Sequence, residues 1–126
     1  MKAKHISILE KQIMDIIWKK QKCSVREVVS ELTKKKTIAY TTVSTIFQRL
    51  YEKGYVVRKE HQKGFIYSPK ISKKIYTKQT IGNFLRNYIQ SFGDLAITSF
   101  AESIEDLPKE KRESLIKLLT QNENNK

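Results

Sequence analysis

Residues 39–54 read AYTTVSTIFQRLYEKG, and this stretch decides the fold. Its apolar residues recur at offsets of three, four and seven positions, which places them on one face of a helix. That face consists of Val43, Ile46, Phe47 and Leu50. The opposite face is polar and consists of Thr42, Thr45, Gln48 and Arg49. Gly54 stands where a helix commonly ends on a left-handed residue, so the pattern predicts an amphipathic helix that ends there.

Two short strands are predicted directly after this helix. Residues 55–60 and 65–68 are rich in β-branched and aromatic side chains, and residues 61–64, HQKG, form the predicted turn. Cations gather at and near the tip of this hairpin, namely Arg58, Lys59, His61 and Lys63. A helix followed at once by a basic hairpin predicts a winged helix-turn-helix domain, in which the hairpin is the wing.

Two further helices are predicted upstream. Residues 8–20 carry an apolar face of Leu9, Ile13, Ile16 and Ile17, and we expect Trp18, the only tryptophan, to pack at the end of this helix. Ser24 and Glu27 have the spacing of a capping box, which predicts a second helix that runs to about residue 33. Three helices with short connections match a helix-turn-helix core.

The outward side chains of the third helix suit the major groove of DNA. Thr and Ser can bind phosphates or contact a thymine methyl group, Gln can pair with adenine, and Arg can pair with guanine. We expect Thr41 and Thr42 to open the helix, one as its N-cap and the next turned toward DNA. The candidate DNA-binding residues are Thr41, Thr42, Ser44, Thr45, Gln48 and Arg49 on the helix and Arg58, Lys59 and Lys63 on the wing. The alternative is a solvated face, but such faces favour Glu, Lys and Gln over Thr and Ser.

The charge of the chain is strongly asymmetric. The net charge is +12 over 126 residues. Residues 1–74 hold eighteen Lys and Arg against six Asp and Glu, whereas residues 75–126 hold seven of each kind. The basic N-terminal part indicates that the protein binds an anionic partner. The neutral C-terminal part indicates a function other than phosphate binding.

Several classes of protein are excluded by what the sequence lacks. The single cysteine, Cys23, excludes an intramolecular disulfide. His5 lies near a terminus and His61 lies in the predicted turn, so neither histidine is placed for catalysis. No nucleotide-binding glycine loop, Gly-x-Ser-x-Gly or His-Glu-x-x-His motif occurs. We therefore expect no enzyme, no cofactor and no metal site. No apolar run approaches the roughly 20 residues that span a bilayer, and the N-terminus lacks a signal-peptide pattern, so we expect a cytoplasmic protein without membrane insertion.

The composition changes at Pro69, which predicts two domains. Residues 1–70 are expected to form the DNA-binding domain and residues 71–126 a helical dimerisation domain. A long amphipathic helix is predicted over residues 72–92, and Gly93 with Asp94 ends it and starts a shorter one. Pro108 is expected in the first turn of a last helix. The predicted fold class is mainly α with a small β-hairpin.

The C-terminal helices have apolar faces but no long core of their own. We therefore expect two copies of the chain to interdigitate there. The expected dimerisation residues are Ile81, Phe84, Leu85, Tyr88, Phe92, Leu95, Phe100, Ile104, Leu115, Leu118 and Leu119. The alternative is that these helices fold back on the winged domain within one chain.

Three segments of the chain resemble a known family. They are EKQIMDIIW at residues 10–18, AYTTVSTIFQRLYEKGYVVRKE at residues 39–60, and GFIYSP at residues 64–69. Together they resemble the penicillinase repressors of the BlaI/MecI type, which are grouped with the copper-responsive CopY repressors. The resemblance covers residues 9–69, and beyond them only the order of helices and the FAES sequence at Phe100 are similar.

The resemblance implies a homodimeric transcriptional repressor that binds a palindromic operator. In β-lactam-responsive members, a membrane sensor-transducer detects the antibiotic and the repressor is then cut before a phenylalanine in its dimerisation module. The similar position here is Ser99-Phe100, although family members commonly have asparagine or alanine in place of Ser99. The copper-responsive branch carries cysteines near its C-terminus, and the absence of any cysteine after Cys23 argues against that branch.

The charge asymmetry and the order of helix and wing favour a sequence-specific dimeric repressor over two alternatives. An architectural or non-specific nucleic-acid protein would give no footprint, and its salt dependence would not vary with sequence. A protein-interaction adaptor would not bind DNA at physiological salt. A repressor of the same family that responds to a different signal is a further alternative, because no motif in the sequence identifies the inducing signal.

Overall fold

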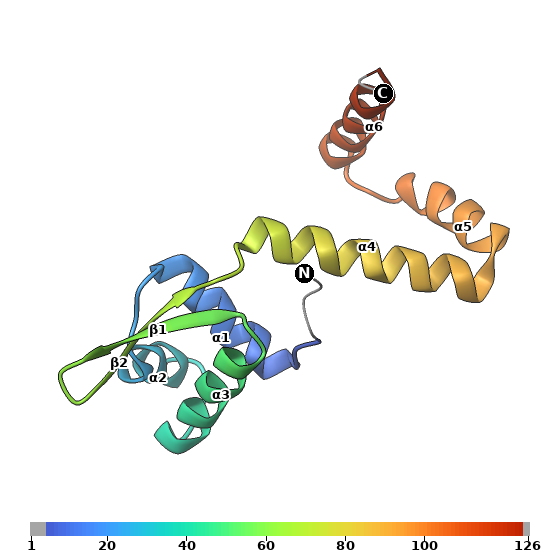
Figure 1. Cartoon of the computed structure of the whole chain (residues 1–126). Coiled ribbons are helices and arrows are strands. Elements are labelled where there is room, and N and C mark those ends of the chain that lie inside the picture. Colours follow the sequence, from blue (N-terminus) through green and yellow to red (C-terminus); the bar gives the residue numbers. More distant parts are fainter. Residues whose placement is uncertain (1–4, 125–126) are drawn as a thin grey trace. The chain divides into compact units, whose positions relative to one another are not determined.

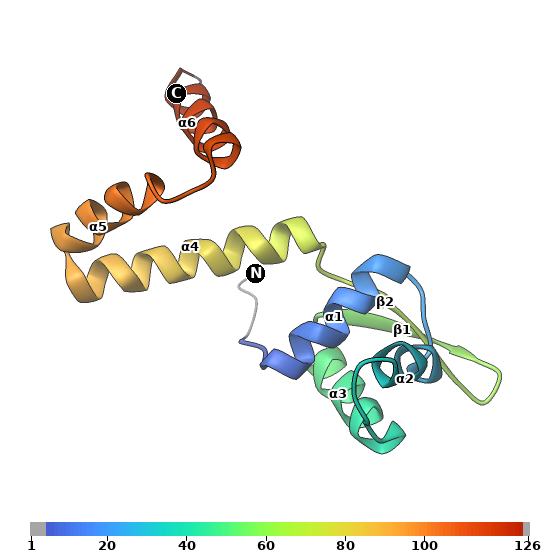
Figure 2. The ribbon, with the colours of Figure 1, turned by 180° about the vertical axis from the view of Figure 1, so that it is seen from behind.

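The computed structural model describes residues 5–124, which divide into two compact units between Ile81 and Gly82. The first unit contains three helices, α1 (Ile8–Lys20), α2 (Val25–Thr33) and α3 (Tyr40–Glu52), followed by an antiparallel hairpin of β1 (Val56–His61) and β2 (Gly64–Pro69). Figures 1 and 2 show from opposite sides that the turn of this hairpin projects beyond the helices. The predicted fold class, mainly helical with a small β-hairpin, is confirmed.

The core of the first unit joins the inward faces of its helices to the hairpin. The whole apolar face predicted for residues 39–54 is buried in it. Its most deeply buried large side chains are Tyr55, Phe47, Ile13, Met14, Ile17, Leu50, Val28, Val43 and Val56. Burying a large apolar side chain contributes roughly 1.5–3 kcal/mol, so this face fixes the rotation of α3 and turns its polar face outward.

Both upstream helices begin at a capping box. Ser7 and Glu10 exchange hydrogen bonds of 2.9 and 3.1 Å at the start of α1. Ser24 and Glu27 do the same at the start of α2, as predicted, with hydrogen bonds of 3.0 and 3.2 Å. These exchanges satisfy backbone N–H groups that a helix leaves without an internal partner.

The predicted end of α3 is confirmed, but its predicted start is wrong. Gly54 has a φ of 83°, and the backbone N–H groups of Tyr55 and Gly54 donate to the carbonyls of Leu50 and Tyr51. This is a Schellman motif. At the other end the N-cap is Ala39, not Thr41 or Thr42. The methyl side chain of Ala39 cannot accept a capping hydrogen bond, but its carbonyl accepts from the backbone N–H groups of Thr42 and Val43 at 3.1 and 3.2 Å.

The hairpin turn is shorter than the sequence indicates. His61 and Gly64 pair with each other as strand residues, so only Gln62 and Lys63 form the tip. Gln62 takes the left-handed conformation, with a φ of 53°. The strand β2 also pairs with a residue outside the hairpin, because the backbones of Cys23 and Tyr67 exchange hydrogen bonds of 3.0 and 2.8 Å. Burial raises the pKa of the Cys23 thiol to about 11.

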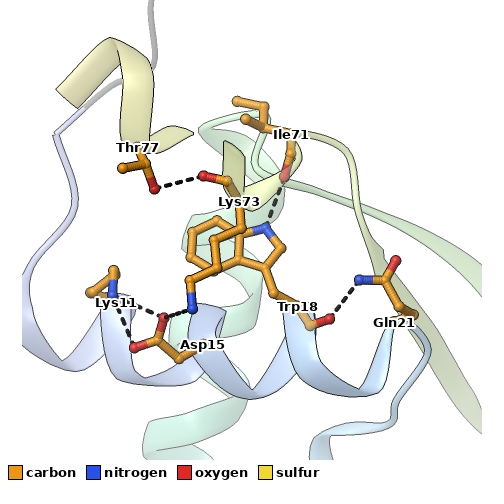
Figure 3. A network of polar contacts seen from close by, with 7 residues as sticks. All are labelled: Lys11, Asp15, Trp18, Gln21, Ile71, Lys73 and Thr77. Atoms are coloured by element: carbon orange, nitrogen blue, oxygen red, sulfur yellow. Dashed lines mark hydrogen bonds and ion pairs between the residues drawn. The ribbon is translucent and has the colours of Figure 1, made fainter. Parts of the chain in front are cut away.

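The start of α4 (Lys73–Phe92) is fastened to α1 (Figure 3). The indole N–H of Trp18 donates to the carbonyl of Ile71 at 2.9 Å in a buried hydrogen bond, which confirms the predicted packing role of Trp18. Its ring lies 5.3 Å from that of Tyr76, and Lys73 forms an ion pair of 4.0 Å with Asp15. The first turns of α4 thus belong to the first unit, and the rest of this helix belongs to the second.

The second unit continues with α5 (Asp94–Ile104) and α6 (Lys109–Asn124). Gly93, with a φ of 61°, separates α4 from α5 as predicted. Pro108 directly precedes α6 instead of lying in its first turn, and its carbonyl accepts from Arg112 at 2.9 Å. Among residues 82–122, Ala96 is the only buried apolar side chain. Within the described part of the chain, every helix is too short or too polar to cross a membrane.

Candidate nucleic-acid interface

The outward face of α3 is polar and accessible. The five side chains Thr41, Thr42, Thr45, Gln48 and Arg49 are exposed, and Ser44 is half-buried. The hydroxyl of Thr45 donates to the carbonyl of Thr41 at 2.9 Å. This hydrogen bond uses the proton of Thr45, so its methyl group and its acceptor lone pairs are what it can offer to a ligand.

A hollow of about 960 Å³ lies between this face and the wing. Ser44, Thr45 and Gln48 line it from α3, and Arg58 lines it from β1. The hairpin tip contributes Gln62 and Lys63, and the first turn of α2 contributes Arg26 and Glu27. The hollow therefore combines hydroxyl and amide groups with three cationic side chains against one carboxylate, which suits a polar anionic ligand.

Arg58 joins the wing to α3. Its guanidinium carbon lies 3.9 Å from the ring centroid of Tyr51 and 4.4 Å from that of Phe65, so two aromatic rings stack on it. The same guanidinium donates to Oε1 of Gln48 at 2.8 Å. Nε2 of Gln48 in turn donates to Glu52 at 3.0 Å.

The structure brings together some of the predicted DNA-binding residues and separates others. Ser44, Thr45, Gln48, Arg58 and Lys63 line one hollow. Thr41, Thr42 and Arg49 lie on the exposed face of α3 outside its lining. Lys59 lies on the other face of the hairpin, where it lines a separate hollow with Val57 and Ile66. Neighbouring strand residues point to opposite faces, so Arg58 and Lys59 cannot both face α3.

Several residues of this region were missed by sequence reasoning. Arg26 faces the hollow because the capping box at Ser24 starts α2 beside the wing, and the box itself was the available signal. Tyr40 lines the hollow from the first turn of α3. Glu52, Tyr51 and Phe65 gave no local signal, because their contacts with Gln48 and Arg58 join separate elements.

The predicted dimerisation residues lie on α4, α5 and α6 and are open to solvent. Phe84, Tyr88 and Phe92 form a ladder along α4, with ring centroids 5.8 and 5.0 Å apart in successive pairs. The half-buried members of the predicted set are Leu85, Tyr88, Ile104 and Leu115, and its exposed members are Ile81, Phe84, Phe92, Leu95, Phe100, Leu118 and Leu119. Within the described residues, no group of three or more His, Cys, Asp or Glu side chains could hold a metal ion.

Comparison with known proteins assigns the family. The penicillinase repressor family model matches residues 6–121. The chain belongs to the penicillinase repressor family. A relative in this family is the methicillin resistance regulatory protein MecI of Staphylococcus aureus strain N315, which is 30% identical over 118 residues. That match covers 94% of this chain and 95% of the relative.

Two solved structures of penicillinase repressors resemble the winged part of the chain. The solution structure of the DNA-binding domain of the repressor BlaI is 34% identical, with a TM-score of 0.54. It is matched over 94% of its length and 60% of this chain. The monomeric form of Bacillus licheniformis BlaI, solved in complex with the blaP half-operator, is 33% identical, with a TM-score of 0.51. That match covers 92% of the BlaI chain and 60% of this one.

Proposed function

We propose that this protein represses transcription by binding double-stranded operator DNA, with α3 in the major groove and the wing beside it. The observation that carries this proposal is the accessible Thr, Ser, Gln and Arg face of α3 next to a hollow lined by cations. Family membership supports it, as does the likeness to a BlaI chain solved with a half-operator.

Phosphate contacts would supply most of the affinity. Arg26 at the first turn of α2 and Lys63 at the wing tip line the same hollow as the α3 face. Backbone N–H groups at the start of α3 add to them, because Ala39 leaves this helix end without a side-chain cap. With about six to ten such contacts, affinity falls on the order of a thousandfold between about 50 and 200 mM salt.

Homodimerisation through residues 71–126 is the second part of the proposal. Two observations support it, because large exposed apolar patches mark association sites. The rings of Phe84, Tyr88 and Phe92 form a ladder along α4, and the second unit buries almost no apolar side chain of its own. A dimer would place two α3 helices about one DNA turn, or about 34 Å, apart on a palindromic operator. Each copy would then read one half-site through residues 1–70.

Release by proteolysis is the third part, with Ser99-Phe100 as the cut and a membrane sensor-transducer system upstream. Phe100 is half exposed, which supports access by a protease. The bond lies inside α5, where the hydroxyl of Ser103 donates to the carbonyl of Ser99 at 2.7 Å. Cleavage therefore needs local opening of this helix. Loss of the dimer would remove the gain from two linked half-sites and leave α3 intact.

A gel-shift experiment tests the DNA-binding part. With a duplex from the region upstream of its own gene, Arg49→Ala and Thr45→Ala should weaken the complex about tenfold, because each good base contact contributes roughly 1–3 kcal/mol of discrimination. Binding to random duplex DNA should change far less. Thr33→Ala is the matched control for Thr45→Ala, since the Thr33 hydroxyl also donates to a backbone carbonyl of its own helix. Equal losses of affinity for the upstream duplex and for the random duplex would contradict the proposal.

A further inference from the structure

The amide of Gln48 is held at both of its ends by groups from two elements. Its Oε1 accepts from Arg58 of β1 at 2.8 Å, and its Nε2 donates to Glu52, one turn further along α3, at 3.0 Å. A carboxamide oxygen has two lone pairs and its nitrogen two N–H groups. One acceptor position and one N–H of Gln48 are therefore still available to a ligand.

The hydrogen bonds also fix which end of the amide is which. Only the oxygen can accept from a guanidinium, and only the nitrogen can donate to a carboxylate, so a flipped amide would lose both bonds. The rings of Tyr51 and Phe65 both lie against the Arg58 guanidinium, with centroids 3.9 and 4.4 Å from its central carbon, and restrict its movement. Gln48 thus presents its acceptor and its donor in a fixed order.

An exposed carboxylate on this face is unfavourable for DNA binding unless it has a role. Glu52 is exposed on the same helix as the candidate DNA-contacting residues, and its charge would repel phosphates. Taken alone, an exposed pair of Gln and Glu four residues apart contributes little to the stability of a helix. What sets this pair apart is that a second element holds the other end of the same amide.

Adenine is the base that matches this arrangement. Its major-groove edge offers the N7 acceptor beside the N6 amino donor, and a glutamine amide can pair with both. We propose that Arg58 and Glu52 are positioning residues that orient the Gln48 amide for one adenine in each half-site. The proposal rests on the DNA-binding function proposed above and assigns Glu52 and Arg58 a role in specificity.

The probe for the test is a duplex enriched by the wild-type protein from a pool of random-sequence DNA. Affinity is measured for this duplex, for each of its single base-pair replacements, and for an unrelated duplex at the same salt concentration. In the wild type, replacing one particular A·T pair should cost about tenfold or more. The Gln48→Ala variant should lose this preference and keep the preferences at the other positions.

The Glu52→Ala variant gives the sharpest result because the two explanations differ in whether the preference for that A·T pair is kept. Removal of a negative charge alone would tighten binding to every duplex. If Glu52 positions Gln48, the preference for that one A·T pair disappears, and the double variant Gln48→Ala/Glu52→Ala shows no further loss of preference. The Arg58→Lys variant keeps the charge but loses the stacked fork, so it should lose the same preference with an unchanged salt dependence.

Lys59→Ala is the matched control for Arg58→Lys, because Lys59 is its strand neighbour on the opposite face. It should weaken binding to all duplexes alike and keep the A·T preference. If the Glu52→Ala or Arg58→Lys variant keeps this preference, the inference is wrong. It is also wrong if either variant loses its preference at every position together with thermal stability. Neither result contradicts the proposed function. A pool from which no sequence is enriched overturns the proposed function and the inference with it.

Discussion

A largely buried ion pair between Glu10 and Lys53 ties the first turn of α1 to the C-terminal end of α3. Glu10 is only 4% exposed, and both of its carboxylate oxygens accept from Nζ of Lys53, at 3.0 and 2.9 Å. Lys53 also donates to the carbonyl of His5 at 3.1 Å. Burial by itself would raise the pKa of Glu10, but the hydrogen bonds from Lys53 and Ser7 lower it overall. The ionised form of Glu10 is therefore the one that stabilises the fold.

This ion pair makes part of the folding stability sensitive to acid. Because the pKa of Glu10 is lower in the folded state, its contribution is fully present above the ordinary value of 4.5 and is lost as pH falls through the folded value. At pH 7 the Glu10→Gln variant should lose roughly 3 kcal/mol, since Lys53 is left half-buried without its partner. Urea unfolding of both proteins between about pH 7 and pH 3 measures the difference.

The difference between wild type and Glu10→Gln should shrink as the pH decreases below about 4.5. Glu60→Gln, on an exposed strand position, is the control and should cost little at any pH. A Glu10→Gln difference that stays constant from neutral to acid pH would contradict the assignment.

At the scale of residues, the sequence predicts burial better than it predicts polar contacts. Val43, Ile46, Phe47 and Leu50 are buried as their spacing predicts, because helical periodicity is a local property. The sequence predicts Arg58 only as one DNA-binding cation of the wing. Its contacts with residues 48, 51 and 65 depend on how separate elements pack, and no local pattern carries that information.

Among the elements, the C-terminus of α3 has the strictest backbone requirement. Gly54 takes a φ of 83°, a conformation that costs a residue with a Cβ atom roughly 1–2 kcal/mol. We expect Gly54→Ala to lower the free energy of unfolding by about 1 kcal/mol, measured by urea titration. The comparison is Gly64→Ala, because Gly64 has an ordinary φ and a Cβ there would meet open space. Equal losses in the two variants would show that backbone strain at Gly54 is not the cause.

The observed ends of helices agree with the predicted ends where capping residues determine them. Ser24 and Gly54 marked the start of α2 and the end of α3 correctly, since each satisfies backbone groups in a way that few residue types can. The start of α3 and the hairpin turn were misplaced. Ala39 is the N-cap of α3 without a side-chain cap, and His61 and Gly64 pair as strand residues, so Gln62 and Lys63 alone form the turn.

Across the whole molecule, apolar surface is divided very unevenly between the two units. The first unit holds nearly the entire buried core, whereas Ala96 is the one buried apolar side chain among residues 82–122. If two copies pair through this second unit, light scattering should give the mass of a dimer. Phe84→Ser should raise the dissociation constant about thirtyfold, because an aromatic side chain central to an interface contributes about 2 kcal/mol.

Ile8→Ser is the matched control for this experiment. Ile8 is 82% exposed, more than the 60% of Phe84, but it lies at the start of α1 in the first unit. Its replacement should leave the mass unchanged. A chain that stays monomeric at all concentrations, or one whose mass responds to Ile8→Ser and not to Phe84→Ser, would contradict dimerisation through the second unit.

The hydrogen bond between Trp18 and Ile71 gives the molecule an optical probe of its own. Trp18 is the only tryptophan, and its buried indole touches the segment that leads into α4. Indole emission responds to the polarity around the ring, so the tryptophan fluorescence of the unlabelled protein comes from one defined place. Its wavelength reports whether the start of α4 stays packed on α1 when DNA is added or when α5 is cut, with no dye and no engineered residue.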